Sequence, residues 1–403
     1  MSIIPLKCPS CGAQLQADSE DDVLVCEHCG ASSVMKDAIN QEHILPPTEE
    51  ADAEDEGDFE IEDGVLVRYY GDADSVVIPE GVTTIGGLAF SGHPSLTSVT
   101  IPEGVTEIVN GAFSYCTSLT SVAIPEGVTE ISSEAFCYCS SLTSVTIPKG
   151  VTEIGIGAFS YCASLTSVTM PEGVTKIATN AFGDCNSLVS VTIPESVTEI
   201  GDSAFNGCSS LTAITIPEGI KEIGMSTFSG CNSLTSVTIP EGVTKIDIAA
   251  FNDCTALVSV TIPKSVIVIG WFAFNGCSSL KSVIIPEGVS AIIRRSFSMC
   301  SSLTSVTIPE SVTDIGAMAF EYCTSLASIT IPEGITEIGN GAFFGCSSLK
   351  SITIPKSVTK IGSAAFAFCT SLESVTFMGD VPELGLGALD EYFERVKRRD
   401  EES

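Results

Sequence analysis

Apolar and polar residues alternate along short segments of the chain, and the same alternation returns at a constant interval. In the segment LTSVTIP at residues 96–102, valine and isoleucine alternate with serine and threonine. A period of two residues predicts a β-strand with one buried face. Pro102 then ends the predicted strand, because proline has no N–H to donate to a neighbouring strand.

A shorter apolar pair follows each of these segments. Val105 and Ile108 predict a second strand on the opposite side of the same unit. Ala112 and Phe113 then close the unit through a compact segment, which we expect to form one helical turn. Because phenylalanine recurs at this place in every unit, from Phe90 to Phe366, it predicts a continuous aromatic column in the core.

The whole unit repeats every 23 residues without an insertion or a deletion. Thirteen leucines fall on this register between Leu96 and Leu372. Such strict self-similarity predicts a solenoid, in which each unit forms one coil and stacks on its neighbours. One coil is too small to bury its own apolar residues, so the stack shares a core. We place this solenoid of about 13 coils at residues 79–379.

These repeating columns resemble the Treponema pallidum-type, or BspA-like, leucine-rich repeat family. The matching motifs are the L-x-x-V-x-I-P strand, the V-x-x-I segment and the A-F-x-x-C closure, which together cover roughly residues 59–380. The resemblance implies a mainly β fold, a right-handed parallel β-solenoid, and a binding role. It also implies a relation to bacterial surface proteins that contact host or neighbouring cells.

Two pairs of cysteines with metal-ligand spacing lie near the N-terminus. Cys8 and Cys11 form one C-x-x-C pair, and Cys26 and Cys29 form a second. This spacing lets both sulfurs of a turn face one ion, and two such turns supply the four thiolates that suit structural zinc. We therefore predict a zinc ribbon at residues 1–36 that holds one Zn²⁺ per chain. A pair of disulfides or redox thiols is the alternative.

The segment that connects the ribbon to the repeats has a different composition. Residues 37–58 show no apolar periodicity, and residues 49–63 contain ten carboxylates and no basic side chain. Such a composition predicts an acidic flexible linker. Two apolar runs around Gly64 then predict a β-hairpin at residues 59–78, which we expect to cap the first coil and cover its strand edge.

The C-terminal residues 380–403 depart from the repeat. Their apolar side chains recur at helical spacing, which predicts a capping helix over the last coil, followed by a charged tail. The residues that we expect on the apolar face of this helix are Leu386, Leu389, Phe393 and Val396.

Charge and targeting signals restrict the classes of partner and the compartment. With 51 acidic and 18 basic residues, the chain has a formal net charge of −33. This charge argues against nucleic acid and anionic membranes as partners. Neither a secretory signal nor an apolar run long enough to span a membrane is present. We therefore predict a cytoplasmic protein, and an exported or surface adhesin is the alternative that the family resemblance suggests.

One cysteine per unit forms a column of twelve, from Cys116 to Cys369. Cysteine behaves as a small hydrophobic residue when buried, and identical stacked positions point in parallel, which prevents disulfide formation between them. We therefore expect structural, reduced thiols in this column and not a metal array. Cys137 lies outside the column, and we expect it near a surface turn as the most reactive thiol.

Two successive units break the pattern at the two residues before Ala-Phe, which are small or polar in most units. Trp271 and Phe272 occupy these positions in one unit, and Arg294 and Arg295 occupy them in the next. Because the register is intact, we expect Trp271 beside Arg294. By the same register, we expect Phe272 beside Arg295. Tryptophan beside arginine is typical of interface hot spots. These four residues are therefore the first candidate partner site, and local drift of one coil is the alternative.

A second candidate partner site is a stacked trio of tyrosines, Tyr115, Tyr138 and Tyr161. No catalytic constellation accompanies either candidate, because all three histidines lie in or before the first unit and no phosphate loop or G-x-S-x-G motif occurs. We therefore predict a non-enzymatic scaffold that binds a protein partner. A regulatory module that docks through its zinc ribbon is a further alternative.

Overall fold

The structure, a computed structural model, describes residues 6–7, 14–15, 23–25, 32–34 and 57–394. The chain divides into two compact units, Met1–Glu56 and Gly57–Ser403. Most of the predicted acidic linker lies outside the described residues. The described part of the first unit consists of two antiparallel strand pairs, β1 (Leu6–Lys7) with β2 (Gln14–Leu15) and β3 (Val23–Val25) with β4 (Ser32–Val34).

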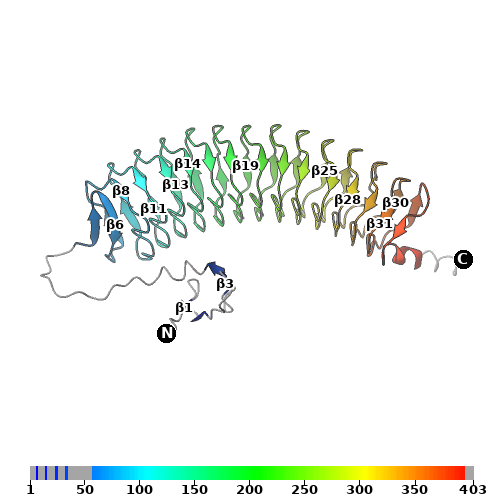
Figure 1. Ribbon diagram of the computed structural model, residues 1–403, viewed down its shortest axis with the longest axis horizontal. Coiled ribbons are helices and arrows are strands. Elements are labelled where there is room, and N and C mark those ends of the chain that lie inside the picture. The colour runs from blue at the N-terminus through cyan, green and yellow to red at the C-terminus, as the bar shows by residue number, and fades with distance from the viewer. Residues whose placement is uncertain (1–5, 8–13, 16–22, 26–31, 35–56, 395–403) are drawn as a thin grey trace. The chain divides into compact units, whose positions relative to one another are not determined.

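Residues 57–394 form a parallel β-solenoid of about 14 coils, which confirms the predicted fold (Figure 1). The L-x-x-V-x-I-P segments form one row of parallel strands, called row 1. Row 1 contains β7 (Ser75–Val77), β9 (Ser98–Thr100), β11 (Ser121–Val122), β13 (Ser144–Thr146), β15 (Ser167–Thr169), β17 (Ser190–Val191), β19 (Ala213–Thr215), β21 (Ser236–Thr238), β23 (Ser259–Thr261), β25 (Ser282–Ile284), β27 (Ser305–Thr307), β30 (Ser351–Ile354) and β32 (Ser374–Phe377).

The shorter V-x-x-I segments form a second row of parallel strands, called row 2. Residues 23 positions apart pair in both rows, as Ser144 does with Ser167. Row 2 contains β8 (Thr84–Ile85), β10 (Glu107–Ile108), β12 (Glu130–Ile131), β14 (Glu153–Ile154), β16 (Lys176–Ile177), β18 (Glu199–Ile200), β20 (Glu222–Ile223), β22 (Lys245–Ile246), β24 (Val268–Ile269), β26 (Ala291–Ile292), β28 (Asp314–Ile315), β29 (Glu337–Ile338), β31 (Lys360–Ile361) and β33 (Glu383–Leu384).

The core lies between the two rows and contains the predicted aromatic column. Thirteen phenylalanine rings stack from Phe90 to Phe366, with successive centroids between 5.0 and 5.7 Å apart. The alternating apolar residues of both rows, such as Val99 and Ile108, are buried against it. Because every coil contributes the same inward side chains, the buried apolar area grows in proportion to the number of coils.

The segment that closes each coil is a series of turns. The expectation that this segment forms one helical turn is therefore wrong. In the coil of Phe113, the amides of Gly111, Phe113 and Tyr115 donate to carbonyls of the next coil at 2.8–3.0 Å. The intervening amides donate to carbonyls three residues earlier. Gly111 and Tyr115 have φ angles of 68° and 60°, which a right-handed helix excludes. We call this segment the return turn.

The N-terminal end of the solenoid is covered by a hairpin. β5 (Phe59–Glu62) pairs with β6 (Val65–Tyr69) in antiparallel fashion, and β6 pairs in parallel with β8 of row 2. The Tyr69 ring lies 5.1 Å from the Phe90 ring and so extends the aromatic column by one member. The hairpin therefore continues both the sheet and the core beyond the first complete coil.

The C-terminal end differs from the sequence expectation. β33 pairs with β31, so the solenoid continues past the predicted end at residue 379. The described helical segment is short, residues 390–394. Leu389 is buried, but Leu386 is 86% exposed and Phe393 is 45% exposed, so these three residues do not form the predicted apolar face. The fourth predicted member, Val396, lies outside the described residues. Leu386 precedes the helix, in the return turn. No helix in the described part of the chain is long and apolar enough to span a membrane.

Candidate partner-binding surface

The main departures from the repeat lie on the outer side of row 2 and in the return turn that follows it. The position two residues after each row 2 strand forms a column, which we call the Trp271 column. The amide after each column residue donates to the carbonyl of the column residue in the next coil, as from Ala249 to Trp271 at 2.8 Å. In five successive coils this column holds Asp202, Met225, Ile248, Trp271 and Arg294.

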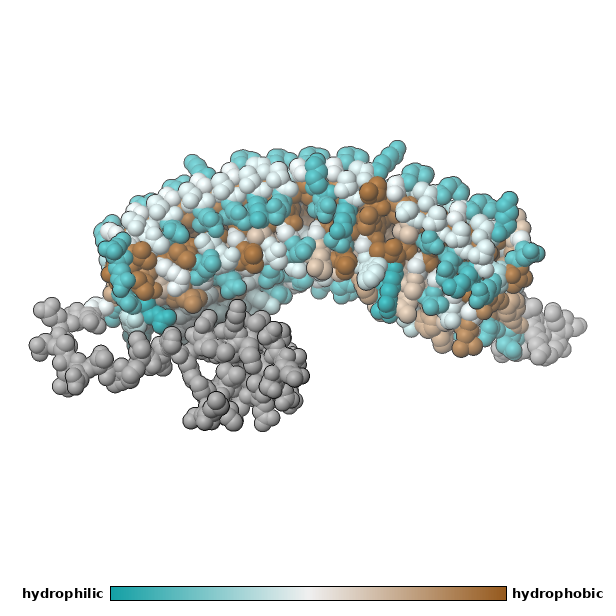
Figure 2. Space-filling model, viewed as in Figure 1, coloured by the Kyte–Doolittle hydropathy of each residue, from teal (hydrophilic) through white to brown (hydrophobic). Residues whose placement is uncertain are grey.

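The middle of this column forms an exposed apolar patch with two further residues, one in the row 2 strand β24 and one directly before it. Met225, Ile248 and Trp271 are 43%, 39% and 53% exposed, respectively. In the coil of Trp271, Ile267 and Val268 are 56% and 41% exposed. These five residues are called the apolar patch. In the view of Figure 2, hydrophobic residues gather at one place between the two ends of the solenoid, and further hydrophobic residues lie near each end.

The patch also interrupts a ladder of charged side chains along row 2. Elsewhere in this ladder glutamate and lysine alternate in places, and Lys176 lies 3.1 Å from Glu153 and 3.7 Å from Glu199. Val268 occupies the same position in β24, where it pairs with Lys245 of β22. A valine at this point removes one charged side chain from the ladder beside the patch, which lowers the cost of removing water there.

The two arginines next to the patch have different surroundings. Arg295 lies over the Phe272 ring at 5.7 Å, which confirms the expected contact of these residues. Its Nε also lies 3.4 Å from a carboxylate oxygen of Glu321. Arg294 follows Trp271 in the column and is exposed, and it makes no ion pair within the described residues. Arg295 is therefore held in place, whereas the Arg294 charge faces solvent.

Two of the bulky residues at this site occupy an unfavourable backbone conformation. Phe272 and Arg295 have φ angles of 59° and 56°, and Met318 in the next coil has 58°. Other coils place glycine at the same position, for example Gly111 and Gly157. A large side chain in the left-handed region costs on the order of 1–3 kcal/mol. The same position is left-handed in the other coils too, for example at Leu88, Glu134 and Ser203, so this conformation belongs to the return turn and does not single out this site.

The predicted tyrosine trio forms a separate stack in the return turns. Tyr115 and Tyr138 lie 4.6 Å apart, and Tyr138 and Tyr161 lie 4.3 Å apart, with nearly parallel rings. Burial and the neighbouring Tyr161 raise the pKa of Tyr138, and burial raises the pKa of Tyr115. The stack belongs to coils near the N-terminal end, so it does not extend the apolar patch.

Several exposed or half-buried residues on the outside of the coils were not predicted. Met225 completes the apolar patch. It can be recognised from the sequence when the repeats are aligned, because it then falls in the same column as Ile248 and Trp271. Tyr322, Phe344 and Phe368 form a further cluster, with edge-to-face ring contacts at 5.4 and 5.0 Å. Tyr322 and Phe368 share their position in the coil with the tyrosine trio, and the same alignment would have identified them.

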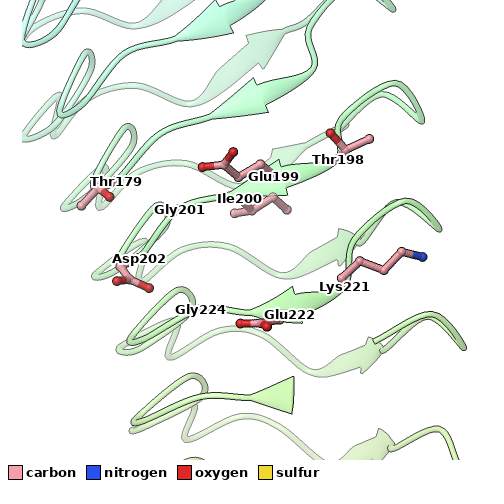
Figure 3. Close-up of a pocket in the computed structure, with 9 residues that line it drawn as sticks. All are labelled: Thr179, Thr198, Glu199, Ile200, Gly201, Asp202, Lys221, Glu222 and Gly224. Atoms are coloured by element: carbon pink, nitrogen blue, oxygen red, sulfur yellow. The ribbon is translucent and has the colours of Figure 1, made fainter. Parts of the chain in front are cut away.

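An acidic pocket borders the apolar patch on its N-terminal side. It has a volume of about 400 Å³ and includes Glu199, Asp202 and Glu222 (Figure 3). Asp202 is a member of the Trp271 column, and its carboxylate accepts a hydrogen bond from the Met225 amide at 2.7 Å. The pocket and the patch are therefore parts of one continuous surface.

The cysteines of the column are buried and hydrogen-bonded within the core, which is typical of a structural role. Each column thiol donates to the carbonyl of a core phenylalanine 26 residues earlier, as from Cys208 to Phe182 at 3.2 Å. All thirteen cysteines in the described residues are unpaired and buried. Burial raises the pKa of the Cys116 thiol to about 12. Thiols in this state are poor nucleophiles.

Cys137 does not lie at an exposed turn, so that expectation is wrong. It is 7% exposed, and its Sγ lies 3.0 Å from Ser160 Oγ. Burial raises its pKa, although the hydrogen bond with Ser160 opposes this effect. The cause is the alternation within the return turn, where the residue between the core phenylalanine and the left-handed position faces inward.

The predicted zinc ligands Cys8, Cys11, Cys26 and Cys29 lie outside the described residues. In sequence, the first pair falls between β1 and β2, and the second pair between β3 and β4. Within the described residues, no group of three or more histidine, cysteine, aspartate or glutamate side chains is placed to hold a metal ion.

Comparison with known proteins identifies the repeat. The model of the BspA type leucine rich repeat region matches residues 68–189, 175–303 and 290–392. No curated protein sequence matches the chain significantly. A leucine-rich repeat protein from Bacteroides ovatus is 30% identical, with a TM-score of 0.54, over 83% of this chain and 94% of that one.

Two further solved structures are similar to the chain. A leucine rich cell surface protein from Faecalibacterium prausnitzii is 30% identical over 82% of this chain and 96% of its own, with a TM-score of 0.49. The leucine rich repeat protein of T. pallidum is 23% identical over 71% of this chain and 82% of its own, with a TM-score of 0.26. Because the family model covers most of the chain, the protein belongs to the BspA-type leucine-rich repeat family.

Proposed function

We propose that the protein is a non-enzymatic scaffold that binds a protein partner through the apolar patch and Arg294. The observation that carries this proposal is the run of Met225, Ile248 and Trp271, which are exposed in three successive coils. Contiguous exposed apolar residues on a soluble protein commonly mark interaction sites. A tryptophan at the centre of such a patch is the side chain most enriched among interface hot spots.

The solenoid supports binding because it holds the patch rigidly. Every coil is hydrogen-bonded to both neighbours through rows 1 and 2 and through the return turns. Trp271 and its neighbours therefore lose little backbone freedom when a partner binds, which reduces the entropic cost of association.

Capture of binding partners from native lysate tests the proposal. The variant Trp271→Ala with Arg294→Glu removes the central side chain and reverses the exposed charge. Loss of a hot-spot residue costs about 2 kcal/mol or more, so we expect retention of a specific protein to fall roughly thirtyfold. Arg294 is preferred to Arg295 because the latter holds Phe272 and Glu321, and its substitution would disturb the fold.

A matched control comes from the same column seven coils earlier. Asn110→Ala with Ser133→Glu introduces the same two residue types at the corresponding column positions, outside the five residues of the apolar patch. We expect this control to retain the partner as the natural chain does. Identical retained proteins for all three chains would contradict the proposal.

We also propose that residues 1–36 form a structural zinc ribbon with Cys8, Cys11, Cys26 and Cys29 as ligands. Two C-x-x-C pairs supply the tetrahedral thiolate set that zinc prefers. The short antiparallel pairs β1–β2 and β3–β4, which flank the cysteine pairs in sequence, support this proposal. Zinc bound by four thiolates has no open coordination position, so the role of the metal is to stabilise the fold.

Metal analysis of the purified chain tests the zinc proposal. We expect one zinc per chain under reducing conditions, and no zinc after Cys8→Ser with Cys26→Ser. Cys137→Ser is the control, because Cys137 lies in the solenoid and serine occupies the same position in neighbouring coils, at Ser114 and Ser160. A natural chain purified without zinc, and unable to take it up, would contradict the ribbon.

A further inference from the structure

The Trp271 column changes character in a fixed order along the solenoid. It starts with the carboxylate of Asp202, continues through the apolar Met225, Ile248 and Trp271, and ends with the guanidinium of Arg294. Consecutive members are linked by backbone hydrogen bonds of 2.8–3.3 Å, so their order in space is their order in sequence. The column is therefore negative at one end, apolar in the middle and positive at the other end, and the Lys245–Asp247 ion pair in the coil of Ile248 adds no net charge to the middle.

The negative end contains more than a single carboxylate. Glu199, Asp202 and Glu222 line the acidic pocket, and in Figure 3 their carboxylates gather on one side. Lys221 also lines the pocket, but its side chain extends to the opposite side in the same view. The pocket thus favours a cationic group, and the adjoining apolar patch gives that group a defined place relative to the rest of a ligand.

The positive end is defined by Arg294 alone. Arg295 is already engaged by the ring of Phe272 and by the carboxylate of Glu321. Arg294 is exposed and makes no ion pair within residues 57–394, so its guanidinium is available for a carboxylate from outside the chain. A bidentate arginine–carboxylate pair at the edge of an apolar contact fixes the orientation of a bound segment.

The distance between the two ends limits the size of the ligand. Parallel strands are about 4.8 Å apart, so the four steps from Asp202 to Arg294 span about 19 Å. An extended polypeptide rises about 3.3 Å per residue, so about six residues cover this distance. This length is that of a short linear segment of a protein.

We propose that this surface recognises a protein segment with a basic residue at one end, an apolar middle and an acidic residue at the other. The basic residue enters the acidic pocket, the apolar side chains cover Trp271 and Ile248, and the acidic residue pairs with Arg294. This inference rests on the proposed protein-binding function and adds the chemistry and the direction of the partner. The acidic pocket disfavours a nucleic acid or an anionic lipid as the occupant.

Titration of the full chain with synthetic peptides tests the inference. Trp271 is the only tryptophan of the chain, so its fluorescence reports binding at the patch itself. The first probe has the composition Lys-Lys-Leu-Phe-Leu-Gly-Asp-Asp. Two others carry the same middle with lysine at both ends or aspartate at both ends. At physiological salt and peptide concentrations up to millimolar, we expect the first to bind about tenfold more tightly than either of the others.

Substitutions at each end of the surface are expected to change the preference in opposite ways. Arg294→Glu should make the peptide with lysine at both ends the tightest, and Glu222→Lys should favour the peptide with aspartate at both ends. Glu130→Lys is the matched control, because it makes the same change in row 2 four coils earlier. It should leave the order of the three peptides unchanged.

Four results would overturn the inference. In the first, the natural chain binds the first peptide and the peptide with lysine at both ends equally tightly, and Arg294→Glu does not change this. General attraction of lysine to an acidic chain would explain such a result. A second is the absence of any Trp271 response. A third is a second copy of the chain as occupant, seen as self-association that Trp271→Ala abolishes. A fourth is an unchanged peptide order in the charge variants. The first, second and fourth results leave the proposed function standing if capture from lysate still retains a protein that is lost when Trp271 is replaced.

Discussion

Raising the pH above 9 is expected to unfold the solenoid. Twelve column thiols, from Cys116 to Cys369, are buried and donate to core carbonyls. Burial raises the pKa of eleven of them, from Cys116 to Cys346, above the ordinary value of 9.0, and to about 12 for Cys254 and Cys300. Between these values the unfolded chain loses its thiol protons and the folded chain keeps them. Stability is therefore fully present below pH 9 and is lost as the pH rises toward the folded values.

The expected size of this effect is large because the thiols act together. Each thiol with a raised pKa lowers the free energy of unfolding by at most about 1.4 kcal/mol for every unit by which the pH exceeds the thiol pKa of the unfolded chain. Eleven thiols together lower the free energy of unfolding by on the order of 10 kcal/mol per pH unit, which is comparable to the total stability of many domains. The urea midpoint, followed by circular dichroism under reducing conditions, is expected to fall steeply between pH 9 and 11.

A variant with fewer column cysteines isolates the contribution of the thiols from other groups that titrate in this range. Alanine at Cys185, Cys208, Cys231 and Cys254 removes a third of the column. We expect the decrease in stability per pH unit to become about a third smaller. A urea midpoint that is the same at pH 8 and pH 10 would contradict the role assigned to the buried thiols.

Truncating one ring in the middle of the aromatic column is expected to destabilise the solenoid more than any other single substitution in its core. The Phe228 ring stacks between Phe205 at 5.7 Å and Phe251 at 5.4 Å and is fully buried. Phe228→Ala removes both contacts and leaves a cavity that the surrounding coils cannot fill. We expect a loss of about 3–5 kcal/mol in the free energy of unfolding, measured by urea denaturation at pH 7.

Phe366→Ala is the control for this prediction because it lies at the end of the same column. Among the described residues its ring has a single stacked neighbour, Phe343, at 5.3 Å. Coils of a solenoid interact mainly with their nearest neighbours, so a change in an end coil disturbs fewer contacts. We expect a clearly smaller loss. Equal losses for the two variants would show that the column does not act as a continuous core.

The inward half of each coil was predictable from sequence for a simple physical reason. Side chains of a strand alternate between two faces, so Val99 and Ile101 had to share a face if either was buried. The repeat interval then transferred that assignment to every coil. The same register placed Arg295 next to Phe272 before any contact was known, and it defined the aromatic column from Phe90 onward.

The return turns were not predictable in the same way. Their side-chain directions depend on left-handed residues such as Gly111 and Tyr115, and bulky residues at these positions hide the glycine signal in other coils. This is why Cys137 was expected at the surface and is buried, and why Leu386 was assigned to a helix. Met225 was missed because it is unremarkable within its own coil and becomes significant only beside Ile248 and Trp271.

Whether the Trp271 column binds a protein is tested most directly by site-specific photocrosslinking in cells that produce the chain. A photoreactive phenylalanine analogue at position 248 lies in the apolar patch, and the same analogue at position 133 lies in the same column outside it. We predict that position 248 forms an adduct with the protein lost from the Trp271→Ala/Arg294→Glu variant in capture, and that position 133 does not. Identical adducts at both positions, or none at position 248, would contradict the proposed binding surface.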